Sequence, residues 1–412
     1  MKPQQCLLLI CLGIFLSSGC SPASTPTPEI AATDSPSLNF GVYDFPKAQS
    51  LSLTGDNSST VYVIYGQDHS LFVARSNDGG QTFRAPVLAT GDNDVHILPV
   101  EHPAISVGTN GIVGIAWLEL PPDYHGATIW YAASEDGGQT FAPAQLVATE
   151  SQGEVAMVQV AFDQAGHPIL AWLNGRQLKF ARSFDHGTTF SDAMSLGTGS
   201  CECCQPQLHV NNEHIYIAYR GLEAGGDQGD IRDIVMIRSE DAGQTFGPVV
   251  PVADAHFYLS ACPIAGPSLA THAGKFYITW MDGRFEESGK FNRGDVWFSM
   301  SQDDGKTFSP NVRINTEQEM HHTLPTIALG PGGRLHVAWE AQARNPSRAF
   351  LYYATSDDSG QTFTAPQVIA DNSDSARGNP GKPLLYIDAS GHVTLAWLDR
   401  LGAHSASWVD IK

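Results

Sequence analysis

Short apolar stretches that alternate with polar positions recur along the whole chain. Seven of them end in an aromatic residue, and further stretches of the same kind precede and follow them. Alternation with a period of two predicts β-strands with one buried face, because successive side chains of a strand point to opposite faces. The seven aromatic residues are Tyr65, Trp117, Trp172, Tyr219, Trp280, Trp339 and Trp397.

A polar eight-residue string follows the third stretch of six of these units. Its Ser and Asp side chains can bond nearby backbone amides, its Gly suits a left-handed backbone, and we expect its Phe to be buried beneath the turn. A fourth stretch follows each string, and four short antiparallel strands per repeat describe a β-propeller blade. The six strings are Ser76–Phe83, Ser134–Phe141, Ser183–Phe190, Ser239–Phe246, Ser301–Phe308 and Ser356–Phe363.

The two counts differ by one, which bears on how the ring closes. Seven aromatic strands favour seven four-stranded blades, but the last unit ends after its third strand, at Ser405–Lys412. We expect Leu38–Phe45 to supply the missing outer strand, which would remove an exposed sheet edge. Six blades with irregular terminal strands is the alternative.

Composition agrees with this all-β prediction and limits the partners. With 40 Gly and 25 Pro among 412 residues, and 16% charged residues, a helical bundle is excluded. The formal net charge of −20, from 23 Lys and Arg against 43 Asp and Glu, repels phosphate backbones and argues against nucleic-acid binding. We expect a monomer without a cofactor.

The first 37 residues are predicted to be a signal peptide followed by an extended tether. Met1–Gly19 resembles a bacterial lipoprotein signal peptide ahead of Cys20, the expected lipidation site, although Leu16 lies one place earlier than usual. Residues 20–37 form a Pro/Ser/Thr-rich tether, and residues 38–412 form the propeller. We therefore expect an exported lipoprotein anchored at the outer membrane or cell surface; ordinary secretion is the alternative.

The repeated string resembles the Asp-box (BNR) repeat, S-x-D-x-G-x-T-F/W, and the arrangement is similar to the sialidase-like propeller superfamily. That superfamily includes exo-sialidases, other glycoside hydrolases and non-catalytic proteins, so the resemblance implies a fold more than an activity. Sialidases place the first arginine of a carboxylate-binding triad in a Phe/Tyr-Arg-Ile-Pro string. The nearest equivalent here is Glu101-His102-Pro103, which would repel a carboxylate, so we expect no sialidase activity.

Aligning the repeats by their aromatic residues places polar side chains at corresponding ends of successive blades. We expect many of them to converge on a central funnel, although any single one can instead be a solvated rim residue. Two loops after second strands, Gly221–Asp233 and Met281–Asp295, are the candidates for ligand contact. If the protein is an enzyme, it is an exo-α-sialidase-like glycoside hydrolase with Asp282, Glu340 or Glu101 as catalytic candidates. The ligand-binding candidates are His102, Gln205, Arg220, Arg284, His321, His322, Asp399 and Arg400.

Four cysteines remain beyond Cys20, and all precede inner strands of two neighbouring units. They are Cys201, Cys203, Cys204 and Cys262. In an oxidising compartment we expect disulfides, with a bridge from Cys203 or Cys204 to Cys262 as the main candidate. A soft-metal site of Cys203, Cys204, Cys262 and His321 is the alternative.

Three functions therefore compete. The favoured hypothesis is a membrane-anchored propeller that binds a glycan or protein partner in its funnel, without sialidase activity. An exo-acting sialidase-like hydrolase with an altered pocket is the first alternative. A metal-handling lipoprotein that uses the Cys/His cluster is the second.

Overall fold

The computed structural model describes residues 41–97, 101–122, 125–284, 293–317, 319–343, 348–374 and 376–410. The chain divides after Ser37, and all described residues belong to the second unit, Leu38–Lys412. Within these ranges the structure is all-β. Its three short 3-10 turns are η1 Thr109–Gly111, η2 Gly226–Gln228 and η3 Pro331–Gly333.

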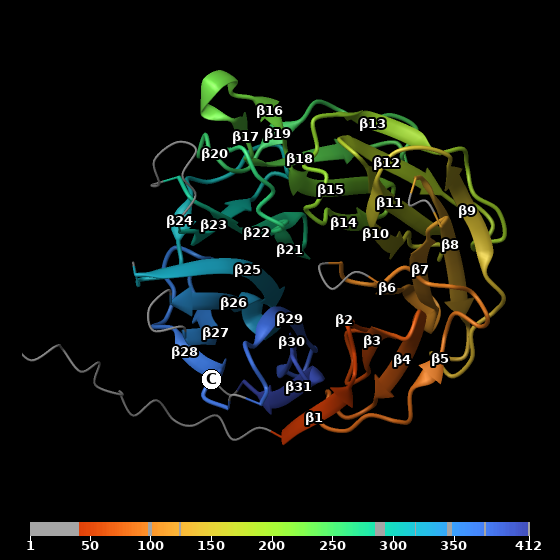
Figure 1. Cartoon of the computed structure of the whole chain (residues 1–412), viewed down its shortest axis with the longest axis horizontal. Coiled ribbons are helices and arrows are strands. Elements are labelled where there is room, and N and C mark those ends of the chain that lie inside the picture. Colours follow the sequence, from red (N-terminus) through yellow and green to blue (C-terminus); the bar gives the residue numbers. More distant parts are fainter. Residues whose placement is uncertain are drawn as a thin grey trace, which may run out of the picture. The chain divides into compact units, whose positions relative to one another are not determined.

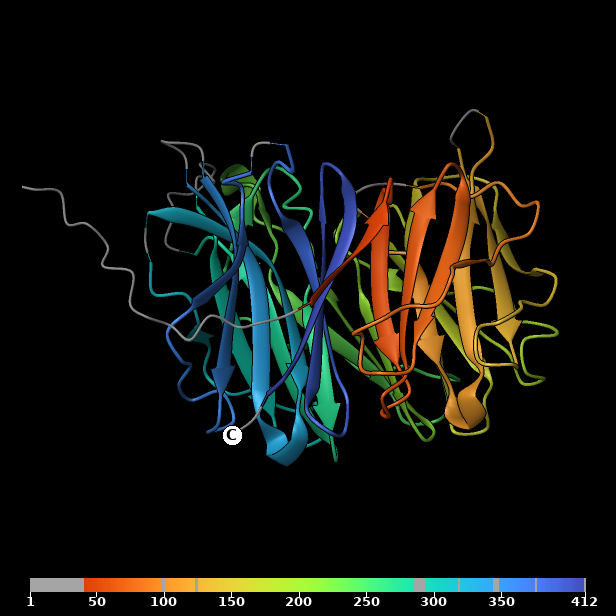
Figure 2. The same cartoon turned by 90° about the horizontal axis from the view of Figure 1, so that it is seen from below.

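The described strands form seven four-stranded antiparallel sheets and one small three-stranded sheet. The seven sheets stand around a central axis (Figure 1), and the strands run roughly along that axis when seen from the side (Figure 2). The first strands lie nearest the axis: β2 Ser50–Gly55, β6 Ala104–Val107, β10 Val155–Phe162, β14 Gln207–Asn211, β21 Ser268–His272, β25 Met320–Leu329 and β29 Gly381–Ile387.

The second strands carry the aromatic residues singled out from the sequence, and all seven of these are buried. These strands are β3 Val61–Gln67, β7 Val113–Glu119, β11 Pro168–Asn174, β15 His214–Arg220, β22 Lys275–Asp282, β26 Leu335–Ala343 and β30 His392–Asp399. The third strands are β4 Ser70–Ser76, β8 Ala127–Ser134, β12 Gln177–Arg182, β18 Ile234–Ser239, β23 Asp295–Ser301, β27 Arg348–Ser356 and β31 Gly402–Val409.

The outer strands include one from the opposite end of the chain. Strand β1, Gly41–Pro46, pairs antiparallel with β31 and completes the last sheet, as expected for the segment before the first repeat. The other six outer strands are β5 Val87–Leu88, β9 Gln145–Glu150, β13 Met194–Thr198, β19 Val250–Pro251, β24 Val312–Arg313 and β28 Gln367–Asp371.

The three-stranded sheet is an addition to this plan. It consists of β16 Glu223–Ala224, β17 Asp230–Ile231 and β20 Tyr258–Leu259, in that order. The loop Gly221–Asp233 therefore carries two short strands. Of the second candidate loop, Met281–Asp295, residues 285–292 lie outside the described part.

The core is divided among the junctions between neighbouring sheets. Seven hydrophobic clusters are found in the described residues, and each joins side chains of two adjacent sheets. One of them joins the first sheet to the last: Phe45 of β1 packs there with Leu51 of β2. Every sheet thus buries both faces against its neighbours, and no junction relies on a single contact.

The repeated polar turns share one hydrogen-bond pattern, shown by the turn after β18. The Ser239 hydroxyl accepts from the Gly243 N–H at 2.9 Å and donates to the Asp241 carboxylate at 2.7 Å. The N–H and hydroxyl of Thr245 both donate to the same carboxylate, at 2.8 and 2.6 Å. The Thr245 hydroxyl is the largest cause of the lowered pKa of Asp241, about 2.

Candidate functional site

The first strands of all seven sheets enclose a cavity of about 610 Å³ on the axis of the ring. Hydroxyl, amide and imidazole groups line much of it, between patches of aliphatic side chains. This mixture suits a ligand that offers both hydroxyl groups and apolar faces. The polar lining residues include Ser52, His102, Gln159, Gln205, Gln207, His209, Asn211, Ser268, Thr326 and Lys382.

Three first strands bulge at the point where they enter the cavity wall. The register with the second strand shifts within β10, β25 and β29. At these bulges Met157, Leu324 and Lys382 have positive φ angles of 61°, 48° and 53°. Non-glycine residues adopt this conformation only where the surroundings compensate for it, and a bulge redirects the side chains that follow. The bulges therefore decide which side chains reach the cavity.

Lys382 is the one described lysine that lines the cavity. Burial lowers the pKa of its amine to about 8, against the opposing attraction of the Glu340 carboxylate. Burial in turn raises the pKa of Glu340, which accepts a hydrogen bond from Gln342. Lys382 was not predicted as a site residue, because the alternating pattern of its strand indicates packing; the Gly-Lys-Pro step at the strand entrance was the available signal.

His102 and Gln205 were predicted to bind a ligand, and the structure places both in the cavity wall. The backbone N–H of His102 donates to the Gln205 side-chain oxygen at 3.1 Å, and the Gln205 amide donates back to the His102 carbonyl at 3.0 Å. The imidazole Nδ1 lies 2.8 Å from the Leu51 carbonyl oxygen. Burial lowers the pKa of His102 to about 4, so the ring is neutral at pH 7.

The three catalytic candidates do not line this cavity. One oxygen of Glu101 accepts the backbone N–H groups of Met157 and Val158, at 2.5 and 3.2 Å. Burial raises the pKa of Glu101 to about 7 in spite of these bonds. Asp282 accepts from the Trp280 indole at 2.8 Å and from Arg284 at 2.6 Å, so its carboxylate already has partners within its own sheet.

The cavity wall also lacks a pair of carboxylates among the residues that the structure describes. Asp163 is its single acidic residue. The Asp163 carboxylate accepts from Arg182 at 2.9 Å and lies 3.1 Å from Nδ1 of His167. Glycoside hydrolysis by the usual route needs two carboxyl groups that flank the scissile bond.

Two of the candidate arginines serve the scaffold rather than the cavity. Arg220 is 1% exposed and donates to the carbonyl oxygens of Ala265, Arg232 and Met281, at 2.9, 2.6 and 2.6 Å. Arg284 is paired with Asp282, and its guanidinium lies 3.8 Å from the centroid of the Trp297 ring. Neither lines the described cavity.

The remaining ligand-binding candidates also lie away from the cavity wall. Arg400 donates to the Ala376 carbonyl at 2.9 Å, and Asp399 lies 2.8 Å from Nε2 of His404. Nδ1 of His321 accepts the Gly294 N–H at 2.8 Å. Nδ1 of His322 accepts the Trp339 indole N–H at 3.0 Å, and burial lowers the pKa of His322 to about 4.

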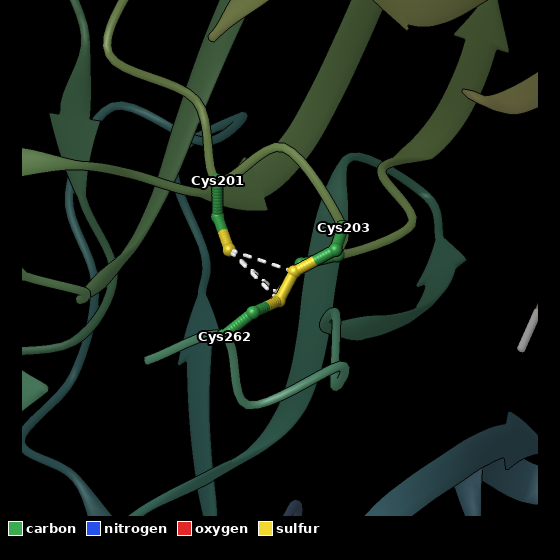
Figure 3. A group of neighbouring side chains, drawn as sticks. Cys201, Cys203 and Cys262 are labelled. Carbon is green, nitrogen blue, oxygen red and sulfur yellow. Dashed lines mark hydrogen bonds between the residues drawn. A yellow bond between two sulfur atoms is a disulfide. The ribbon is translucent and has the colours of Figure 1, made fainter. Parts of the chain in front are cut away.

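The four cysteines lie together, with all their sulfur atoms within 4.8 Å of one another, and Cys203 lines the cavity. Figure 3 shows three of them, Cys201, Cys203 and Cys262. Cys203 and Cys262 form a disulfide with a Cα–Cα distance of 6.5 Å, one of the two bridges to Cys262 expected from the sequence. Cys201 and Cys204 are free and buried, with 3.0 Å between their sulfur atoms. Within the described residues, these four cysteines are the group whose ligand atoms lie that close to one another, and His321 is not among them.

The predicted lipidation site, Cys20, lies outside the described residues. In the part of the chain that is described, no helix has the length and apolar character needed to span a membrane.

Comparison with known proteins identifies the fold. No family model matches the sequence, and no curated protein matches it. Solved structures do match. A PL25 ulvan lyase bound to -[GlcA(1-4)Rha3S]- is 12% identical, with 90% of this chain and 94% of that chain covered and a TM-score of 0.55. The Penicillium chrysogenum α-L-arabinanase complexed with arabinobiose is 12% identical, with 88% and 93% covered and a TM-score of 0.50. At such identities the likeness concerns the fold alone, and the protein is a β-propeller.

Proposed function

We propose that this protein is a glycan-binding propeller that holds its ligand in the central cavity without hydrolysing it. The observation that carries the proposal is the chemistry of the wall: among the described residues, amides, hydroxyls and one amine surround the cavity, with a single carboxylate that is already paired. Amides and hydroxyls match sugar hydroxyl groups, whereas glycoside hydrolysis by the usual route needs two carboxyl groups that flank the scissile bond. The two matched propellers were solved with saccharide ligands, and we extend that ligand class to this chain.

The finer assignment of the fold belongs to the same proposal. We assign the seven four-stranded sheets to seven blades and the six repeated turns to Asp boxes. The shared Ser, Asp, Gly and Thr hydrogen bonds support the second assignment. These turns lie at the outer strands, away from the cavity, so they stabilise the scaffold rather than bind the ligand.

Binding is tested with a glycan array followed by calorimetry on the oligosaccharides that are retained. Lys382→Met removes the one described ammonium of the wall and should weaken binding about tenfold or more, the usual effect of losing a charged hydrogen bond. Lys306→Met changes an exposed lysine in a turn and should leave affinity unchanged. Equal affinities of the two variants for the same oligosaccharide, or binding to no glycan on the array, would refute the proposal.

The same amine predicts how binding depends on pH. Since its pKa is about 8, Lys382 carries its positive charge below pH 8 and loses it as the pH rises further. Affinity should therefore fall between about pH 7 and pH 9 in the unmodified protein and stay flat in Lys382→Met. A parallel fall in both proteins would assign the effect to another group.

The absence of hydrolysis is tested separately with chromogenic sialosides and neutral glycosides. We expect no release of the chromophore above background. Release that disappears in Asp282→Asn or Glu340→Gln would instead support the sialidase-like alternative.

We also propose that the propeller is exported and anchored through lipid on Cys20, at the outer membrane or cell surface. The apolar run and small residues before Cys20 support this. Metabolic labelling with an alkyne fatty acid should mark the unmodified protein, and Cys20→Ala should abolish both the label and recovery in the membrane fraction. Labelling that persists in Cys20→Ala would contradict the proposal.

A further inference from the structure

Four sulfur atoms meet beside the cavity in a group that the proposed function does not use. Cys201 Sγ lies 3.0 Å from Cys204 Sγ and 3.9 Å from both Cys203 Sγ and Cys262 Sγ. All four sulfur atoms lie within 4.8 Å of one another. Cys201 and Cys204 are each 1% exposed, whereas Cys203 borders the cavity.

One structural disulfide does not account for this arrangement. The Cys203–Cys262 bridge needs two cysteines, and the other two thiols are buried directly against it. Sulfur ligands at 2.3 Å from a tetrahedral zinc ion lie about 3.8 Å apart, close to the two separations of 3.9 Å around Cys201. For all four sulfur atoms to take this spacing, the separation of 3.0 Å between Cys201 and Cys204 has to lengthen, and Cys203 and Cys262 have to separate on reduction.

Two buried guanidinium groups favour negative charge at the sulfur atoms. Arg232 is 3% exposed, and its Nη1 donates to Cys201 Sγ at 3.0 Å. Arg220 is 1% exposed, and its charge also acts on the Cys201 and Cys204 thiols. Arg232 also lies 3.8 Å from Glu202 and 3.7 Å from Asp230, which offset part of its charge.

The same arginines hold the two cysteine segments in place. Arg232 Nε donates to the Leu259 carbonyl at 3.0 Å, three residues before Cys262. Arg220 Nε donates to the Ala265 carbonyl at 2.9 Å, three residues after Cys262. The segment that carries Cys262 is thus fixed on both sides against the turn that carries the other three cysteines, and such outer hydrogen bonds orient the ligands of a metal site.

We propose that reduction of the Cys203–Cys262 disulfide converts the four cysteines into a binding site for one thiophilic divalent metal ion such as Zn²⁺. Thiolates prefer soft or borderline ions, and four of them around Zn²⁺ form a closed tetrahedral site. A divalent ion leaves less excess negative charge than Cu⁺ would, so the two guanidiniums compensate it better. Cys203 at the cavity edge gives the ion a path from solvent.

The chemistry balances if a dithiol supplies the electrons. A dithiol reductant transfers two electrons and two protons to the Cys203–Cys262 disulfide and becomes a disulfide itself, which leaves four protein thiols. Each thiol releases its proton as it binds the ion. In the reverse direction, a disulfide oxidant takes two electrons from the Cys203 and Cys262 thiolates and becomes a dithiol, the Cys203–Cys262 bond re-forms, and the ion loses two ligands and is released, so metal binding follows the redox state.

The test measures metal uptake by the reduced and the disulfide-bonded protein. After reduction with a phosphine and its removal without oxygen, we expect about one Zn²⁺ per chain by atomic emission, and none in the disulfide-bonded form. Co²⁺ in place of Zn²⁺ should give thiolate-to-cobalt absorption and the visible bands of tetrahedral Co²⁺. This readout does not involve glycans, so it fails or succeeds independently of the proposed function.

Variants locate the site. Cys201→Ser should weaken Zn²⁺ binding at least tenfold, and Arg232→Met about tenfold or more. His321→Ala, outside the group, is the matched control and should bind like the unmodified protein. Lack of Zn²⁺ uptake by the reduced protein, unchanged affinity in Cys201→Ser, or uptake of Cu⁺ alone would overturn the proposal. If a cysteine variant fails to fold, the redox comparison and the cobalt spectrum still decide.

Discussion

At the scale of single residues, Glu101 is buried but has an incomplete set of partners. One carboxylate oxygen accepts two backbone N–H groups, while the other is buried without a hydrogen-bond partner. Burial is the largest influence on this carboxyl and raises its pKa from 4.5 to about 7. A group so perturbed makes stability depend on pH, because the folded and unfolded states take up protons differently.

The sign of the Glu101 effect is fixed by its raised pKa. As the pH rises from about 4.5, the unfolded chain ionises first, so the folded state loses relative stability until about pH 7. The loss amounts to about 3 kcal/mol at roughly 1.4 kcal/mol per pKa unit. Glu101→Gln keeps the acceptor oxygen and cannot ionise, so its free energy of unfolding should vary less over this range.

Urea unfolding at pH 4.5, 5.5 and 7 measures this difference. Glu154→Gln changes an exposed carboxyl and is the control, expected to keep the pH dependence of the unmodified protein. If Glu101→Gln also keeps it, the carboxyl does not titrate as described.

The role of a residue could be predicted from the sequence only where it did not depend on the direction in which the side chain points. A bridge from Cys203 or Cys204 to Cys262 was expected because these residues precede neighbouring inner strands, and the structure forms it with Cys203. Arg220 and Lys382 show the opposite case. Arg220 was expected in the funnel but is held by three carbonyl oxygens, whereas Lys382 reaches the cavity. A bulge with positive φ directs Lys382, and single-strand periodicity does not reveal bulges.

At the scale of elements, the repeated turns join each sheet to the one before it. We expected the turn Phe to be buried under its own turn; the structure instead places it in the cluster shared with the preceding sheet. Phe83 packs where the last sheet meets the first, and Phe246 packs where the third meets the fourth. The junction between the sixth and seventh sheets has no turn Phe among its described members, and Trp408 packs there against Tyr353.

The glycine of the turn also packs against the preceding sheet. Gly243 has φ of +84°, and a Cβ at this position would lie 2.6 Å from the Phe180 ring of the preceding sheet. Gly243→Ala should therefore destabilise the protein in two ways, through a left-handed backbone that costs about 1–2 kcal/mol for a residue with Cβ and through displacement of Phe180. Gly332 has φ of +70° with open space around it, so Gly332→Ala should show the backbone cost alone.

Denaturant unfolding of the two variants separates these contributions. If the turns hold neighbouring sheets together, Gly243→Ala should lower the free energy of unfolding more than Gly332→Ala does. Equal losses would mean that the turn contributes only its own conformation.

Most strands were predictable because their alternation survives in each repeat, but the small sheet of β16, β17 and β20 was not. Its strands have two residues each and come from segments on either side of β18 and β19. Pairing between so few residues depends on their surroundings, here the buried Arg232 that follows β17 and donates to Leu259 of β20.

At the scale of the whole molecule, stability depends on closing the ring. The junction of the last and first sheets is built from both ends of the described chain: β1 pairs with β31, and Phe45 of β1 packs against Tyr65 and Phe83 of the first repeat. Without β1, the outer edge of β31 would expose unpaired backbone groups, a surface prone to pairing with other chains.

Phe45→Ala should consequently affect the entire propeller. Phe45 is 2% exposed, and truncating a buried Phe to Ala costs about 3–5 kcal/mol. Val42→Ala on the same strand changes a side chain that is 49% exposed and should alter the free energy of unfolding by less than about 0.5 kcal/mol. Because each sheet is stabilised by both neighbours, we expect one cooperative transition at lower denaturant for Phe45→Ala.

Sedimentation should in addition show self-association of a protein shortened to begin at Lys47. A monomeric, equally stable shortened protein would mean that the ring holds without β1.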